Sequence, residues 1–147
     1  MRIDKELIDT WKASVIEIKV DSLWKVIWDG VNCVTRNYPD FVLGNELYVL
    51  TAYNPGSMIR DEEINIQANQ ELLQRITQVN GAQWLESVGR SLSGSHCEYG
   101  FAIFGVDKGE IDNLAIEFGQ IGYYRFLGTA MEIFAKNSED EFDLITS

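Results

Sequence analysis

The chain's one histidine stands in the run His96-Cys97-Glu98, beside a thiol and a carboxylate. Adjacent residues on a strand point to opposite faces, so His96 and Cys97 would not form a nucleophile–base pair. His96 and Glu98 could share a face and act as an acid–base pair. The alternative is structural, with His96 in a loop and Cys97 as a small buried filler. The run assigns no catalytic residue, so whether the protein is an enzyme stays open and the balance favours a non-catalytic protein.

Carboxamide side chains form a second candidate group. Asn54 ends an apolar stretch, and Asn65 and Asn69 share one helix face at a spacing of four residues. Amides offer a donor and an acceptor together, which suits a small polar ligand or a peptide backbone. The alternative is that they bond nearby or buried backbone groups. The candidate ligand-binding set is Thr51, Tyr53, Asn54, Asn65, Asn69, Glu98 and Gln120.

These side chains need a scaffold, which the hydrophobic periodicity outlines. An apolar strand at 47–53 stops at Asn54-Pro55-Gly56-Ser57, where Pro55 lacks a donor and Gly56 permits a positive φ. Asp61 is a predicted N-cap, and a helix follows to about residue 79. Asn54 and the first helical turn would then be neighbours, whereas the loop at Gln120 could lie at either end. Further predicted elements are strands at 84–88 and 99–104, a helix from 107 to 118 and a hairpin at 121–127 and 129–135.

The remaining segments flank this core. Residues 1–46 predict a short helix with the apolar stripe Leu7, Ile8 and Trp11, a hairpin at 15–20 and 24–28, and an irregular stretch. Residues 47–135 form the α+β core, and 136–147 an acidic tail expected to fray. No linker or repeat interrupts the chain, so 1–147 is predicted to be a single domain.

The order from residue 47 is strand, helix, strand, strand, helix, strand. This order is typical of the split βαβ pattern, so we predict an α+β two-layer sandwich with a ferredoxin-like core. The N-terminal helix and hairpin and one extra C-terminal strand would decorate it. Right-handed crossovers would place both core helices on one sheet face. A different α+β order of the same elements remains the alternative.

A family resemblance rests on Thr51-Ala52-Tyr53-Asn54-Pro55-Gly56-Ser57, followed by Asn65, Asn69 and Leu72. Supporting residues are Glu98-Tyr99-Gly100-Phe101, Gly105 and Phe118-Gly119-Gln120. Together they resemble the bacterial domain-of-unknown-function family numbered 3293, over roughly residues 47–127. The resemblance brings no activity with it, so it sharpens the candidate site and leaves the function open.

The charge is strongly acidic and uneven. The formal net charge is −11, and residues 61–147 hold five Lys or Arg against fifteen Asp or Glu. Binding of nucleic acid is excluded because no stretch supplies a basic patch. The acidic half either keeps the surface solvated or docks a basic protein. The candidate interface residues are Glu110, Asp112, Glu117, Glu139, Asp140, Glu141 and Asp143.

The composition also bears on metal binding, membrane contact and cellular location. One histidine and two distant cysteines fall short of a zinc site, and we predict no metal and no cofactor. No apolar run approaches bilayer length and no secretory signal is visible, which predicts a cytoplasmic protein with two free thiols and no membrane contact.

Two functions of different classes follow. The first is a non-catalytic module that binds a basic protein, for example as an immunity-like inhibitor of a nuclease toxin. The second is a small-ligand protein or enzyme that uses Asn54, Asn69, Glu98 and Gln120. In the second case, Asn69→Ala should abolish ligand binding while leaving thermal stability nearly intact.

Overall fold

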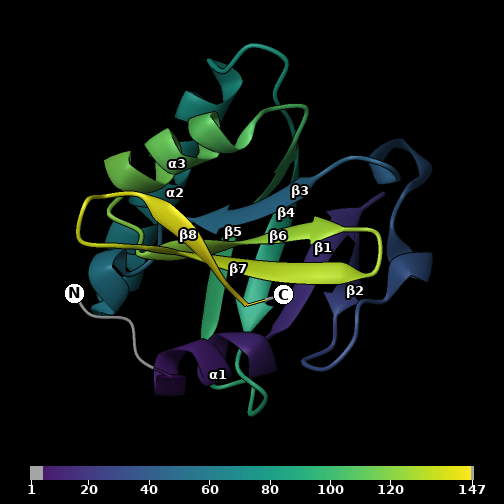
Figure 1. The fold of residues 1–147 in the computed structure, drawn as a ribbon, viewed down its shortest axis with the longest axis horizontal. Helices are drawn as coiled ribbons and strands as arrows, with labels where there is room; N and C mark the ends of the chain where they lie inside the picture. Colours follow the sequence, from purple (N-terminus) through teal and green to yellow (C-terminus); the bar gives the residue numbers. More distant parts are fainter. Residues whose placement is uncertain (1–4, 147) are drawn as a thin grey trace.

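The computed structural model describes residues 5–146 and shows there an eight-stranded sheet with three α-helices (Figure 1). Every strand pairing is antiparallel. The predicted α+β class is therefore confirmed. The helices are α1 (Lys5–Ala13), α2 (Glu62–Thr77) and α3 (Lys108–Glu117); the strands are β1 (Val15–Val20), β2 (Leu23–Trp28), β3 (Leu47–Thr51), β4 (Gln83–Arg90), β5 (Cys97–Phe104), β6 (Gly122–Leu127), β7 (Ala130–Lys136) and β8 (Phe142–Thr146).

The sheet is larger than the predicted core, with the order β2-β1-β4-β5-β3-β6-β7-β8. Helix α2 connects β3 to β4, and α3 connects β5 to β6. The N-terminal hairpin extends one side of the sheet because β1 pairs with β4, with Ile16 opposite Gly89. The hairpin was predicted, but its place beside β4 was not, because sequence periodicity carries no information on which distant strands pair.

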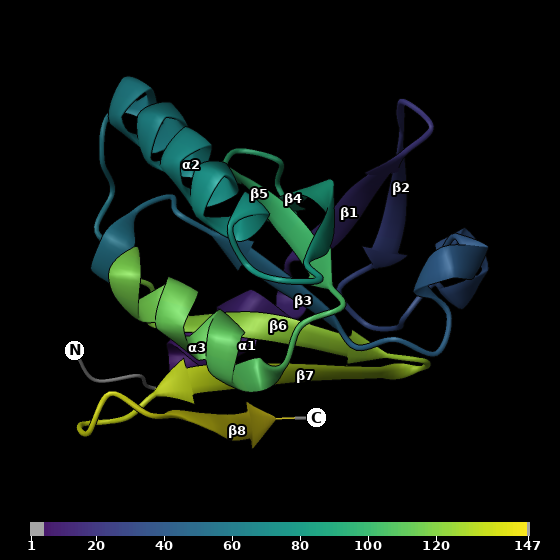
Figure 2. The ribbon, with the colours of Figure 1, turned by 90° about the horizontal axis from the view of Figure 1, so that it is seen from above.

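Successive side chains along each strand point to opposite faces of the sheet, so a separate hydrophobic core forms on each face. In β3, Tyr48 and Leu50 point to one face, where they pack in one cluster with Leu72 of α2 and Ile111 of α3. Val49 points to the other face and packs with Ile16 and other strand residues. Helices α2 and α3 thus lie next to each other on one face, as predicted for both core helices (Figure 2).

Helix α1 packs on the opposite face and is attached by its C-terminal end. The indole N–H of Trp28 donates to the Lys12 carbonyl at 2.8 Å, and the Tyr124 hydroxyl donates to the Trp11 carbonyl at 2.8 Å. Both carbonyls lie in the last turn of α1, where a helix has no intrahelical partner for them, and the Trp11 carbonyl also accepts the Ser14 N–H. No residue of α1 is fully buried, although Trp11 packs against the core. The helix therefore covers the sheet loosely rather than completing a dense layer.

The C-terminal tail differs from its prediction. Residues 142–146 form β8, which pairs with β7, so the expected fraying is wrong for this segment. Phe142 is buried against Tyr123 with ring centroids 5.3 Å apart, and this aromatic contact anchors the strand. The acidic residues between β7 and β8 form a turn in which the Asn137 side chain accepts the N–H groups of Glu139 and Glu141.

Within the same residues 5–146, no helix combines the length and the hydrophobicity that crossing a bilayer requires.

Candidate functional site

The turn after β3 holds Asn54 in a strained but well-supported conformation. Its φ of 49° and ψ of 60° are left-handed, which Asn adopts more readily than most residues. Just before it, the Thr51 hydroxyl donates to the Tyr99 carbonyl at 2.6 Å and accepts the Tyr53 N–H at 3.0 Å. These bonds tie the end of β3 to β5 and fix the direction in which the Asn54 side chain leaves the sheet.

Asn54 and Asn65 form a reciprocal buried pair. The Asn54 backbone N–H donates to Asn65 Oδ1 at 2.9 Å, and Asn65 Nδ2 donates to Asn54 Oδ1 at 2.9 Å. Asn54 Oδ1 also accepts the Arg60 N–H at 2.9 Å. Asn65 is only 3% exposed, so its amide joins α2 to the β3 turn and has no face left for a ligand. These are the contacts that the structural interpretation describes for Asn65.

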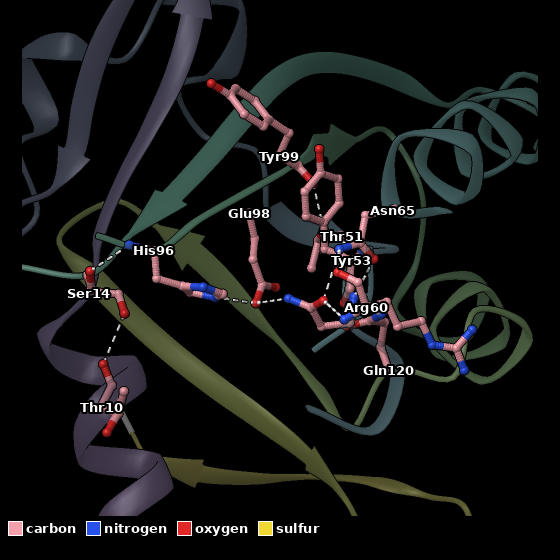
Figure 3. Close-up of polar contacts among 12 residues, drawn as sticks. Thr10, Ser14, Thr51, Tyr53, Arg60, Asn65, His96, Glu98, Tyr99 and Gln120 are labelled. Atoms are coloured by element: carbon pink, nitrogen blue, oxygen red, sulfur yellow. Dashed lines mark hydrogen bonds and ion pairs between the residues drawn. The ribbon is translucent and has the colours of Figure 1, made fainter. Parts of the chain in front are cut away.

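Glu98 connects this pair to His96. Asn54 Nδ2 donates to Glu98 Oε2 at 3.2 Å, and the same oxygen lies 2.8 Å from His96 Nε2. Figure 3 shows the His96 ring pointing toward the Glu98 carboxylate. The shared face predicted for His96 and Glu98 therefore brings the two side chains into contact. The arrangement holds the imidazole in one orientation.

Gln120 comes from a distant part of the chain to the same end of the sheet. Its Nε2 donates to the Tyr53 carbonyl at 3.1 Å, and the neighbouring Gly119 carbonyl accepts the Gly56 N–H at 2.8 Å. Gly119 has a φ of +66°, and a Cβ there would lie 3.0 Å from Pro55 Cβ. A glycine is thus required for the loop after α3 to approach the β3 turn, which settles the position that the sequence left open.

Tyr53 and Asn69 lie outside this arrangement in different ways. The Tyr53 hydroxyl donates to Glu62 at 2.9 Å, and burial followed by this bond raises the pKa of the phenol. Asn69 lies one turn beyond Asn65 on α2, and its buried Oδ1 has no hydrogen-bond partner among residues 5–146. No hydrogen bond among the described residues joins Asn69 to Asn54 or Glu98, so the structure does not bring Asn69 into their network.

A cavity of about 490 Å³ opens beside Glu98, between α1 and the sheet face opposite α2 and α3. Its floor is formed where β4 and β6 carry small residues, Ser87, Gly89 and Gly122. Larger side chains there would fill the space beneath α1. Of the candidate set, Thr51, Asn54, Glu98 and Gln120 line this cavity, and Tyr53, Asn65 and Asn69 do not.

The sequence missed several lining residues because they come from segments with no motif. Trp11 of α1 and Tyr124 of β6 form an aromatic wall, with ring centroids 6.4 Å apart. Burial raises the pKa of the Tyr124 phenol, which keeps it neutral. Ser87 is 2% exposed, and its hydroxyl has no hydrogen-bond partner within the described part of the chain. Because Ser87 lines the cavity and its hydroxyl makes no hydrogen bond to the described residues, that hydroxyl is available to a molecule held there.

Arg90 also lines the cavity, and its charge is already paired. Its guanidinium contacts Glu17 of the neighbouring strand β1, and Glu17 is 9% exposed. The pairing of a buried carboxylate with an arginine offsets the cost of removing both charges from water. Arg90 therefore brings no unpaired positive charge to the cavity lining.

The acidic candidates gather at another place, in an open groove between α3 and the β7–β8 turn. The groove has a volume of about 660 Å³, and Lys108, its only basic lining residue among the described ones, is paired with Asp112 at 2.9 Å. Glu117 lies outside the groove, paired with Arg75 at 2.8 Å, and Glu139 is also absent from its lining. The acidic residues that line it are Asp107, Glu110, Asp112, Asp140, Glu141 and Asp143.

Residues 5–146 contain no group of three or more His, Cys, Asp or Glu side chains placed to hold a metal ion. The acids of the groove are therefore spread along a surface rather than gathered around one point.

Comparison with known proteins identifies a family match. Residues 50–121 match the model of a family described as a protein of unknown function (DUF3293), which confirms the resemblance inferred from the sequence. The matched segment runs from β3 to the loop at Gln120 and contains Thr51, Asn54, Glu98 and Ser87. No curated protein and no solved structure matches the chain.

Proposed function

We propose that this chain, whose residues 50–121 match the DUF3293 family model, binds a small organic molecule in the cavity between α1 and the sheet. The observation that carries the proposal is the convergence of polar residues of the matched segment on one cavity: Thr51, Asn54, Ser87 and Glu98. Its volume of about 490 Å³ falls within the ordinary range of small-molecule sites.

The lining favours binding over catalysis. Apolar surface forms most of the wall, from side chains such as Trp11, Val49 and Tyr124, and polar side chains of several elements interrupt it. This division is typical of ligand sites in which the polar groups set orientation. Among the described residues, no nucleophilic side chain hydrogen-bonds to the His96 ring, so the proposal includes no catalytic step.

Two finer assignments accompany this function. The order β4-β5-β3-β6, with α2 and α3 on one face, supports a ferredoxin-like core within the larger sheet. Cys33 and Cys97 are both free thiols, which supports a reducing, cytoplasmic location.

Filling the cavity should remove binding without harming the fold. Gly89→Leu adds a side chain at a position that lines the cavity. Its Cβ would lie 3.3 Å from Cδ1 of Ile16, which is the flexible end of that side chain, and would meet no other atom within 4 Å beyond its neighbours in the chain. We expect this variant to stay folded and to lose the bound molecule. The measurement is mass spectrometry of small molecules that the protein retains after mixing with a metabolite extract and gel filtration.

Gly109→Leu is the matched control, because it adds the same atoms on α3 in the acidic groove, away from the cavity. It should retain the same compounds as the unmodified protein. The proposal fails if the unmodified protein retains nothing, or if Gly89→Leu retains the same compounds in the same amounts.

A second candidate function is the binding of a basic protein along the acidic groove, for example a nuclease toxin that an immunity-like inhibitor would mask. The specific support is that Glu110, Asp112, Asp140, Glu141 and Asp143, predicted separately from two segments of the chain, line one groove. Charge complementarity of this kind mainly speeds association and selects the partner.

Replacing the acidic residues of the groove by neutral ones should strongly weaken the binding of such a partner. We expect the fourfold variant Glu110→Gln, Asp140→Asn, Glu141→Gln and Asp143→Asn to lower the association rate with a captured basic protein by at least about tenfold. The measurement is affinity capture from the source cell followed by surface plasmon resonance at low and high salt.

A charge-matched control removes four exposed acids elsewhere, at Glu6, Asp9, Glu63 and Glu86. It should leave the association rate within about twofold of the unmodified protein, since those acids lie outside the groove. Equal losses in both variants would show a general charge effect and would remove the groove as the docking surface.

A further inference from the structure

The polar end of the cavity has an unused acceptor. Glu98 engages both His96 and Asn54 through Oε2, and its Oε1 has no hydrogen-bond partner within residues 5–146. The side chain is 29% exposed and lines the cavity. A half-buried carboxylate with one free oxygen is best completed by a donor that also carries positive charge.

Ser87 provides a second unused group close to the first. Gly89 of β4 lies opposite Glu98 of β5, and Ser87 lies opposite Gly100. Ser87 and Glu98 are therefore diagonal neighbours on one sheet face, with glycines at the two positions between them. The two side chains flank a gap in the floor of the cavity, where a small head group could contact both.

Among the described lining residues, no lysine or arginine pairs with Glu98. Arg90 also lines the cavity, but its guanidinium is engaged with Glu17. His96 Nε2 contacts only Oε2 of Glu98, which leaves Oε1 without a cationic partner among residues 5–146. The head group of a ligand thus meets a carboxylate oxygen with no cationic partner, which disfavours carboxylates and phosphates.

Much of the cavity wall is apolar. Trp11 and Tyr124 form one wall, and Val49 and Ile121 belong to the other lining residues. Such a surface accommodates a hydrocarbon or aromatic body, and aromatic faces also tolerate a nearby cation.

We propose that the ligand of this cavity is a small amphipathic primary amine. Its ammonium group donates to Glu98 Oε1 and to the Ser87 hydroxyl, and its apolar body lies against Trp11 and Tyr124. This inference rests on the proposed binding function and adds to it the chemical class of the molecule.

The test uses three probes with the same body and different head groups: 2-phenylethylamine, 2-phenylethanol and 3-phenylpropionate. Isothermal titration calorimetry measures the Kd of each with the full chain. We expect the amine to bind at least tenfold more tightly than the alcohol, and the carboxylate to bind most weakly, because a charge-assisted hydrogen bond is worth roughly a tenfold gain or more over a neutral one.

Two variants test whether Glu98 and Ser87 cause the preference for the amine. Glu98→Gln keeps the shape and an acceptor for His96 and Asn54 but removes the charge, so the amine should lose at least tenfold in Kd while the alcohol changes by less than about threefold. Ser87→Ala breaks no hydrogen bond of the protein and should weaken the amine by about threefold or more without lowering the Tm.

The outcomes separate this inference from the function on which it rests. The amine class is wrong if the alcohol or the carboxylate binds as tightly as the amine. It is also wrong if no probe binds although the unmodified protein retains metabolites that the Gly89→Leu variant does not. In both cases the proposed binding function of the cavity stands. An unchanged amine Kd in Glu98→Gln likewise overturns the amine class. If the amine binds equally well to Gly89→Leu, the cavity is not its site and both proposals fall.

Discussion

Replacing Gly100 by alanine should lower the free energy of unfolding by about 3 kcal/mol or more. A Cβ at this position would collide with the Leu50 carbonyl oxygen and would lie 3.0 Å from both the Leu50 carbonyl carbon and Thr51 Cα. These atoms belong to the backbone of β3 at the centre of the sheet, so they cannot move aside without breaking its pairing with β5. Urea denaturation would measure the change, and the Tm should fall by about 10 °C.

Gly89→Ala is the matched control, because the same substitution is made on the same sheet face of the adjacent strand. Its Cβ would approach only the Ile16 side chain, at 3.3 Å from Cδ1, which can rotate away. We expect no loss of stability and a gain of up to about 1 kcal/mol, because glycine in a strand interior is unfavourable. Equal stability of Gly100→Ala and Gly89→Ala would refute the close approach of β3 and β5.

The second large loss of stability is expected for Asn65→Ala. The substitution removes the acceptor of the Asn54 backbone N–H and the donor to Asn54 Oδ1, at a position 3% exposed. Leaving buried polar groups unpaired costs about 1–3 kcal/mol, and the space left by the amide adds to it. We expect the free energy of unfolding to fall by about 3 kcal/mol in urea denaturation.

Asn69→Ala provides the comparison on the same helix face, four residues away. Its Oδ1 is buried without a partner among the described residues, so truncation breaks no hydrogen bond there, and alanine is the better helix former. Stability should change by less than about 0.5 kcal/mol. A large loss for Asn69→Ala, or none for Asn65→Ala, would show that the two amides have been given the wrong roles. In contrast to the expectation from sequence, Asn69→Ala should leave cavity binding unchanged, because Asn69 does not line it.

Local chemistry was enough to predict the elements that hold the site. The apolar run 47–53, the turn at Pro55 and the amphipathic pattern of α2 each describe a structure formed by neighbours in the chain. For the same reason the Asp107 cap of α3 was predictable: its side chain accepts the Glu110 N–H, three residues away, at 3.0 Å. The proximity of Asn54 to the start of α2 followed from chain adjacency alone.

The sequence by itself therefore determined the α+β class, the turn at Asn54, the shared face of His96 and Glu98, and the acidic bias, because each depends on residue type and short-range periodicity. Only the tertiary structure decided that β1 pairs with β4, that Gln120 reaches the β3 turn, and that α1 covers the face carrying Ser87 and Gly89. These contacts join segments far apart in the chain. They form where the apolar surfaces of those segments are buried against each other, and no local sequence pattern specifies which surfaces pair. The cavity exists because small residues of β4 and β6, two strands that β5 and β3 separate in the sheet, lie beneath the same helix.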